Sequence, residues 1–452
     1  MKKNLLIILL AGLMTLSFTA CGKSLDIGSR FDSGKTSRLD MERVSFEEMV
    51  SDHSLLSGLP LKSKTEYAYY EELESEPLGL ETLNSSGSFE YIDEESNYQV
   101  TNADNLLSVF YKTLFGSPAM ITISESMTID FSQYQLSSDE ENESSGFLNG
   151  ILIIPSGVTL TIENKADFGY ISFERLYIAE GGKLILKDTA LTCEKAVIVE
   201  DGGTVEMSHT RWDVGQLANY GMILLKEASG YENWMNINNA NIPRMKEMPA
   251  FYNARSGVID ITSGYVQINC SSGRATYAEE SFGLKGVDFG WEFVGYPWGM
   301  NSGKILTGAD GTLEIKDSFS ADGAPVYNKE PFVNNGMIDI STDMTDKSRG
   351  VMIEACHFQN YGTMNLNGSL EQKYIESPLV LTYNCFIENY GEINVQIPIG
   401  VAMNISGATV PNYFINYKSA AIHDNIQGEN AAAFQVAYGE GTLYFNDVIP
   451  MQ

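Results

Sequence analysis

The chain has 452 residues, 43% of them hydrophobic, and its 59 acidic and 29 basic side chains give a formal net charge of −30 at pH 7. A protein of this charge stays soluble and repels phosphate backbones, so nucleic acid is excluded as a partner. The acids are spread along the chain, and their one dense run, SSDEENESS at 137–145, fits a solvated loop better than a calcium site.

The first residues have the pattern of an export signal. Two lysines precede an apolar run from Leu5 to Leu16, and the small residue Ala20 stands directly before Cys21. This order predicts a signal peptide over residues 1–20, and the apolar run is too short for a transmembrane helix. Cys21 resembles the lipobox cysteine of bacterial lipoproteins, which implies lipidation there; an ordinary secretory signal is the alternative. We therefore expect a lipid-anchored, extracytoplasmic protein at the cell surface.

The next segments carry weaker patterns. Residues 21–42 are polar and rich in Gly and Ser, which predicts a flexible tether. Residues 43–98 fit helix or strand about equally well in stretches such as TEYAYYEELE and GSFEYIDEE, so no fold is assigned to them. They form an uncertain segment between the tether and a domain expected over residues 99–452.

That domain opens with a helix pattern. In TNADNLLSVFYKTLFGS, Asn102 or Asp104 can cap the helix, and apolar residues share one face: Leu106, Leu107, Phe110, Tyr111 and Leu114. The following AMITISESMTIDF alternates apolar and polar residues, as a strand does. A single amphipathic helix before many strands predicts a helix that covers the open end of a strand stack.

From residue 150 onward a strand motif recurs. Asn-Tyr-Gly begins at Asn219, Asn360 and Asn389, and FVNNG at 332–336 is a close variant. Glycines followed by apolar residues at the second and fourth positions recur roughly every 18 to 29 residues, and three longer gaps, such as the one from Gly221 to Gly257, fit two units each. A repeat of this length indicates a solenoid.

The repeat also suggests how the units pack. Each unit is a strand too short to bury its apolar face alone, so stacking equivalent positions about 4.8 Å apart lets one turn cover the next. Aligned asparagines can then pair their amides in a ladder. Cys356 and Cys385 hold equivalent positions in CHFQNYGTMNL and CFIENYGEINV, and we expect free, buried thiols in neighbouring turns. An all-β sandwich is the alternative fold.

With these motifs the chain resembles the right-handed parallel β-helix proteins of the pectate-lyase-like superfamily, in their surface-lipoprotein, adhesin-like branch. The resemblance covers roughly residues 99–452 and includes VTNADNLLSVF and MITISESMTI as capping helix and first strand. It implies an all-β fold, a right-handed parallel β-helix (solenoid) with an N-terminal capping helix. The superfamily's enzymes cleave acidic polysaccharides with carboxylates, calcium or a basic residue, but their polygalacturonase and pectate-lyase motifs are absent here.

Other chemical motifs are equally scarce. The four histidines, His53, His209, His357 and His423, have no metal-ligand spacing and are expected to be ordinary surface or turn residues. No catalytic residue, metal site or cofactor is therefore assigned from the sequence. A glycosidase pair of carboxylates brought together across turns stays open as an alternative.

The most distinctive segment outside the repeat is SFGLKGVDFGWEFVGYPWGMNSG at 281–303. It concentrates aromatic and acidic side chains, and we expect five of them to contact a glycan or a surface protein: Trp291, Tyr296, Trp298, Asp288 and Glu292. The alternative is a loop whose rings form a satellite core. The sequence favours a non-catalytic surface binding protein over a polysaccharide lyase or hydrolase, and over a structural envelope component.

Overall fold

A computed structural model describes residues 41–44, 68–85, 96–113, 118–131, 146–163, 170–226, 233–238, 248–270, 298–317, 331–342, 350–354, 356–368, 379–382, 385–395, 399–404, 412–417, 420–424, 432–437 and 443–448. The chain divides into two compact units, Met1–Met41 and Glu42–Gln452. The elements discussed below belong to the second unit.

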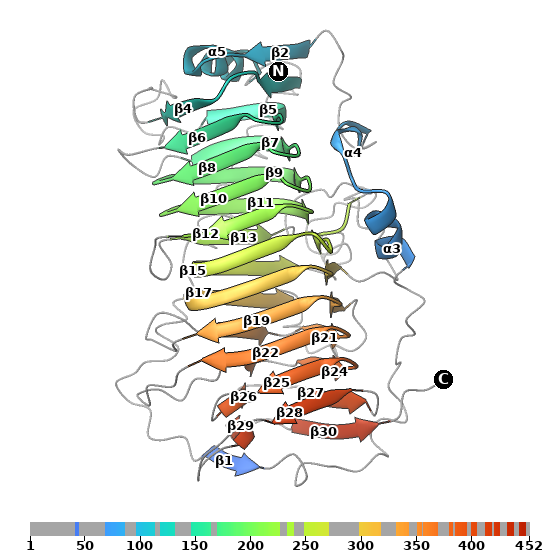
Figure 1. The fold of residues 1–452 in the computed structure, drawn as a ribbon. Helices are drawn as coiled ribbons and strands as arrows, with labels where there is room; N and C mark the ends of the chain where they lie inside the picture. The colour runs from blue at the N-terminus through green and yellow to red at the C-terminus, as the bar shows by residue number, and fades with distance from the viewer. Residues whose placement is uncertain are drawn as a thin grey trace, which may run out of the picture. The chain divides into compact units, whose positions relative to one another are not determined.

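In this unit the chain coils through three parallel sheets, and each coil adds strands to all three (Figure 1). Sheet 1 consists of β4 (Met127–Asp130), β6 (Thr159–Glu163), β8 (Lys183–Lys187), β10 (Thr204–Ser208), β12 (Met222–Leu225), the starts of β15 (Val258–Cys270) and β17 (Lys304–Asp317), β19 (Met337–Thr342), β22 (Thr363–Gly368), β25 (Glu392–Val395) and β28 (Ala421–Asp424). Sheet 2 consists of the starts of β5 (Gly146–Ile154), β7 (Tyr170–Ile178), β9 (Ala190–Val199) and β11 (Arg211–Asn219), then β13 (Trp234–Asn238), the ends of β15 and β17, β20 (Gly350–Glu354), β23 (Leu379–Thr382), β26 (Ile399–Asn404) and β29 (Ala432–Ala437).

Sheet 3 forms the remaining side of each coil. It consists of β2 (Asn97–Val100), β3 (Ala119–Ile123), the ends of β5, β7, β9 and β11, then β14 (Phe251–Asn253), β16 (Gly299–Asn301), β18 (Phe332–Asn334), β21 (His357–Asn360), β24 (Phe386–Asn389), β27 (Asn412–Tyr417) and β30 (Leu443–Val448). The helices are α3 (Ala68–Ser75), α4 (Leu80–Ser85) and α5 (Ala103–Thr113), and β1 spans Met41–Val44. The fold is all-β, a parallel β-helix with a helix before its first coils, as the sequence predicts.

The core lies inside the coils and consists of stacked columns of identical or similar side chains. One column on sheet 1 runs through paired strands and is buried throughout: Ile223, Ile259, Ile305, Ile338, Met364 and Ile393. These residues stand two positions after each turn glycine, where the sequence pattern places inward side chains. Full burial of such a side chain contributes about 1.5–3 kcal/mol, so each coil is stabilised mainly by its neighbours.

The coil length inferred from the long glycine gaps is wrong. Strand β12, which follows Gly221, pairs directly with the start of β15, which follows Gly257, so a single coil separates these glycines. Gly311 lies within β17 on sheet 2 rather than at the turn before sheet 1. The pattern of glycine plus two apolar residues recurs on more than one sheet, and insertions lengthen some coils, so spacing alone miscounts them.

The Asn-X-Gly motif marks the turn from sheet 3 to sheet 1. The turn asparagines of successive coils form a ladder in which each side-chain amide donates to the side-chain oxygen of the next asparagine at 2.7–2.8 Å: Asn219, Asn253, Asn301, Asn334, Asn360, Asn389 and Asn416. Five of these belong to Asn-X-Gly, whereas Asn253 and Asn416 lack a glycine two residues later. The glycine is required because a Cβ on Gly362 would lie 2.0 Å from the carbonyl oxygen of Gly336. The predicted amide ladder is confirmed, and from Asn219 to Asn416 it gives buried side-chain amides hydrogen-bond partners.

The predicted capping helix is α5. The side-chain oxygen of Asn102 accepts the backbone N–H of Asn105 at 2.9 Å, a helix N-cap bond. Leu106, Leu107 and Phe110 are buried, and the Phe110 ring lies 5.6 Å from that of Phe173 in sheet 2. The helix therefore covers core side chains of the early coils with Leu106, Leu107 and Phe110 of the predicted apolar face; the side chain of Tyr111 and Leu114 lie outside the described residues.

The aligned cysteines are buried, as expected. Cys356 and Cys385 directly precede β21 and β24, whose residues pair in register, and both are thiols outside any disulfide that join the apolar core. Cys193 is also free and buried, and burial raises the pKa of its thiol above the usual range. Thiolate is the reactive form, so all three should be inert in the folded protein.

We expect Cys193, Cys356 and Cys385 to react with iodoacetamide only as fast as the protein unfolds. Peptide mass mapping after timed labelling, with and without urea, measures this for each cysteine separately. Rapid native-state labelling of Cys356 or Cys385 would contradict their inward register.

Candidate functional site

Residues 68–85, which form α3 and α4, lie against the outer side of sheet 3 and are called the strap below (Figure 1). Many outward positions of sheet 3 between β5 and β18 are apolar, so they need a cover. The strap and sheet residues form a second apolar cluster, apart from the core inside the coils: Tyr70, Leu73, Leu83, Ile151, Ile153, Tyr177, Ala196, Ile198, Ala218, Tyr220, Met248, Tyr252, Ala254, Met300 and Val333. The uncertain segment thus contains a structural element that the sequence reading did not identify.

Polar contacts also hold the strap to the coils. The backbone N–H of Leu78 donates to the hydroxyl of Tyr220 at 3.0 Å, and burial raises the pKa of Tyr220 to about 12. The guanidinium of Arg175 donates to the carbonyl oxygen of Leu83 at 2.6 Å. Burial lowers the pKa of Arg175 to about 10, which still leaves it charged at neutral pH. These contacts join residues roughly 90 to 140 positions apart, so the strap position depends on the finished coils.

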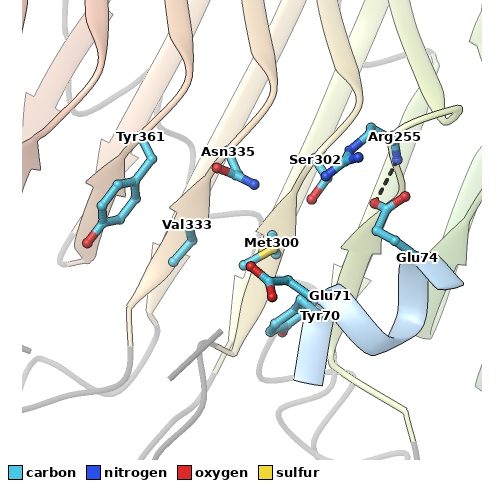
Figure 2. Close-up of a pocket in the computed structure, with 9 residues that line it drawn as sticks. All are labelled: Tyr70, Glu71, Glu74, Arg255, Met300, Ser302, Val333, Asn335 and Tyr361. Carbon is cyan, nitrogen blue, oxygen red and sulfur yellow. Dashed lines mark hydrogen bonds between the residues drawn. The ribbon is translucent and has the colours of Figure 1, made fainter. Parts of the chain in front are cut away.

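A pocket of about 180 Å³ lies between α3 and the edge of sheet 3 (Figure 2). Its lining comes from the helix and from successive coils: Tyr70, Glu71, Glu74, Arg255, Met300, Ser302, Val333, Asn335 and Tyr361. Clefts that hold drug-sized ligands measure about 300–1,000 Å³, so this one fits a single small chemical group.

The polar wall of the pocket follows from the Asn-X-Gly turns. Ser302, Asn335 and Tyr361 are the X residues of three consecutive coils, and Figure 2 shows them in a row along the turn edge. At these turns the ladder requires the asparagine and the close backbone approach requires the glycine. Neither restricts the side chain at X. The repeat therefore places a hydroxyl, an amide and an aromatic ring side by side.

Tyr361 ends a stack of tyrosine rings. Its ring centroid lies 4.4 Å from that of Tyr390 with an interplanar angle of 1°, and Tyr390 stacks on Tyr417 at 3.9 Å. One face of the Tyr361 ring is therefore packed against Tyr390, and Tyr361 also lines the pocket. Stacking restrains the ring orientation, which lowers the entropy cost of binding a ligand against it.

The charged residues of the pocket have different roles. One Glu74 carboxylate oxygen accepts the hydroxyl of Tyr252 at 2.5 Å and the backbone N–H of Arg255 at 3.0 Å, the bond drawn in Figure 2. Burial, and then the contact with Glu74, raise the pKa of Tyr252 above its usual range, so the hydroxyl stays protonated. Glu74 thus fastens α3, whereas Glu71 and the side chain of Arg255 are exposed at the rim. The rim offers one carboxylate and one guanidinium.

Beyond the pocket, sheet 3 carries a buried polar cluster around Glu388. His357 Nε2 lies 2.8 Å from the carboxylate, the Gln359 amide donates at 2.6 Å, and the hydroxyls of Tyr390 and Tyr417 donate at 2.9 and 2.6 Å. His357 is only 2% exposed, so the expectation that it is an ordinary surface histidine is wrong. Its outward position alternates with inward Phe358, but neighbouring side chains enclose it. Burial alone would raise the pKa of Glu388, but the contacts with His357, Gln359 and Tyr417 lower it overall.

Sheet 2 carries another buried carboxylate, Glu314. The hydroxyl of Tyr265 and the amide of Gln267 donate to it, and Lys316 Nζ lies 3.4 Å away. Burial raises the pKa of Glu314 to about 7; Lys316 opposes the rise and Glu354 adds to it. These side chains already bind one another, so the cluster offers a ligand fewer groups than the pocket does.

The structure describes part of the aromatic segment at 281–303 and tests one of its predicted ligand contacts. Trp298 is 4% exposed, belongs to the apolar core, and its ring lies 5.2 Å from that of Phe332. The expectation that Trp298 contacts a ligand is therefore wrong for this residue, because Phe332 and its neighbours hold the ring inside. Four other candidates lie outside the described residues, and their role stays a prediction: Trp291, Tyr296, Asp288 and Glu292.

Sequence reasoning did not identify the pocket residues. The three X residues differ in chemistry, so no shared letter marked them, although their fixed place beside Asn and Gly was a usable signal. Tyr70, Glu71 and Glu74 lie in the segment to which no fold was assigned.

Among the described residues, no group of three or more His, Cys, Asp or Glu side chains could hold a metal ion. No helix in the described parts of the chain is long and apolar enough to span a membrane.

Comparisons with protein-family models, with curated proteins and with solved structures find no match to this chain. The function proposed below therefore depends on the geometry of the pocket and on the sequence signals.

Proposed function

We propose that this protein is a lipid-anchored, extracytoplasmic binding protein of the pectate-lyase-like β-helix type. It binds a neutral glycan in the pocket between α3 and sheet 3 without cleaving it. The lipid anchor is inferred from the signal pattern before Cys21, and the superfamily from the resemblance of residues 99–452. The aromatic segment at 281–303 remains a candidate for further contacts to the same ligand.

One observation carries the proposal. An oriented aromatic ring, a hydroxyl, an amide, a carboxylate and a guanidinium surround one small pocket at the side of a regular β-helix. Sugars present apolar ring faces together with hydroxyl groups that both donate and accept hydrogen bonds, and this set of side chains complements both features. The chain's charge of −30 disfavours polyanionic glycans, which leaves neutral ones.

Tyr361→Ala should weaken glycan binding by about tenfold or more, because it removes the ring against which the sugar packs. The measurement is binding of full-length protein in detergent to an array of neutral glycans, followed by titration of the best ligand. Met222→Ala is the matched control, since Met222 is 41% exposed on sheet 1 and does not line the pocket.

Two results would count against this function. Equal binding by wild type and Tyr361→Ala would move the site away from the pocket. Release of new reducing ends from a bound polysaccharide would instead indicate a hydrolase or lyase, the alternative that the sequence leaves open.

A further inference from the structure

The floor of the pocket differs from its rim. Met300 and Val333 occupy paired positions in β16 and β18, and their side chains point outward from sheet 3 toward α3 (Figure 2). They are 3% and 1% exposed and belong to the apolar cluster under the strap. These two lining side chains are apolar and almost fully covered, so a ligand group that contacts them must be small and apolar, because an unpaired polar group would be costly.

Groups that donate and accept hydrogen bonds stand directly beside this floor. Ser302 lies two residues after Met300, and Asn335 lies two residues after Val333, so each coil supplies one apolar and one polar side chain. A hydroxyl and a primary amide can each donate and accept. Neighbouring coils are about 4.8 Å apart. A ligand with an apolar group bonded directly to an amide can therefore contact Met300 and Val333 with the apolar group and Ser302 and Asn335 with the amide.

Tyr361 forms a third surface of the pocket, against which a ring of the ligand can pack. Tyr361 is the X residue one coil beyond Asn335, and its orientation is restrained by the stack with Tyr390. The pocket of about 180 Å³ accepts one group of a larger ligand, with the remainder outside. A methyl group, an adjoining amide and a pyranose ring, in that order from floor to rim, match these three surfaces.

We propose that the pocket selects a sugar with an acetamido substituent, such as a terminal N-acetylhexosamine. This inference rests on the proposed glycan-binding function and names its ligand class. The acetamido methyl packs on Met300 and Val333, the amide bonds with Ser302 and Asn335, and the sugar ring lies against Tyr361. A parent hexose has a hydroxyl in place of the acetamido group, which leaves the apolar floor without a partner.

The test compares N-acetylglucosamine and N-acetylgalactosamine with glucose and galactose as soluble probes, using saturation-transfer NMR and calorimetry on full-length protein in detergent. The acetamido sugars should bind about tenfold or more tightly than the parent hexoses. Val333→Thr keeps the side-chain shape but places a hydroxyl in the floor, and it should reduce this ratio about tenfold. Asn335→Ala changes an exposed side chain that the fold does not need, so it tests the amide contact even if Val333→Thr fails to fold.

The outcomes separate the two proposals. Equal affinity for acetamido sugars and parent hexoses would overturn the acetamido selectivity and leave glycan binding intact. Preference for acetamido sugars that survives in both Val333→Thr and Asn335→Ala would also overturn it, because the preference would then arise elsewhere. Absence of binding to all four sugars and to the glycan array would overturn the proposed function itself. Loss of the preference in either variant, with Met222→Ala unchanged, supports the assignment.

Discussion

Glu388→Ala is expected to lower the free energy of unfolding by about 3–5 kcal/mol, because it leaves buried donors without their acceptor. His357, Gln359 and Tyr417 all contact this carboxylate, and all are at most 2% exposed. Water cannot replace the lost carboxylate without opening the outer side of sheet 3. The urea midpoint and its slope, followed by tryptophan fluorescence, measure the change.

Glu392→Ala is the matched control, since Glu392 is exposed in the same coil and should change stability by no more than about 0.5 kcal/mol.

The Glu388 cluster also predicts how folding stability changes with pH. The pKa of Glu388 is lowered in the folded protein, so its contribution is present above the unfolded pKa of about 4.3 and is lost as the pH falls through the folded pKa. Equal midpoints for Glu388→Ala and Glu392→Ala would show that the cluster contributes nothing net.

Glu314→Gln is expected to make the protein more stable than wild type at pH 8. Burial raises the pKa of Glu314 to about 7, whereas an unfolded glutamate titrates near about 4.3. Between these values the folded protein keeps a proton that the unfolded chain has released, so stability falls as the pH rises. A difference of this size corresponds to about 4 kcal/mol, and glutamine removes the titration while keeping the side-chain shape.

The measurement is the melting temperature from pH 4 to pH 9 for wild type, Glu314→Gln and the exposed control Glu392→Gln. Wild type and the control should lose stability together as the pH rises, and Glu314→Gln should lose less. Parallel curves for all three proteins would show that Glu314 is ionised throughout, with Lys316 as a sufficient partner.

The strap connects the fold with the proposed function. The helix α3 supplies three of the residues that line the pocket, and contacts with coils remote in sequence hold the strap in place. Ligand binding and strap docking must therefore favour each other, as linkage requires of two processes that share a structure.

The repeat itself was readable from the sequence because its cause is local. In the coils from Asn219 to Asn416 the turn uses an asparagine for the ladder, in most of them a glycine where the backbones approach, and inward apolar residues at alternate positions, so the same letters recur. The capping helix was readable for the same reason, since Asn102 and the apolar face of α5 are encoded within one short segment. Architecture follows from these repeated local requirements.

The pocket was decided only by the tertiary structure. Tyr361 and Glu71 line the same pocket because coiling and strap docking bring together residues nearly 300 positions apart in the chain, and no periodicity relates the two. Trp298 illustrates the opposite error: its aromatic neighbours in sequence suggested a surface ring, but packing against Phe332 from the next coil buries it. His357 is likewise buried by side chains from neighbouring coils. Sequence determines which side chains a coil presents, and only the stacking of coils and the docking of the strap decide which of them are covered and which meet around a ligand.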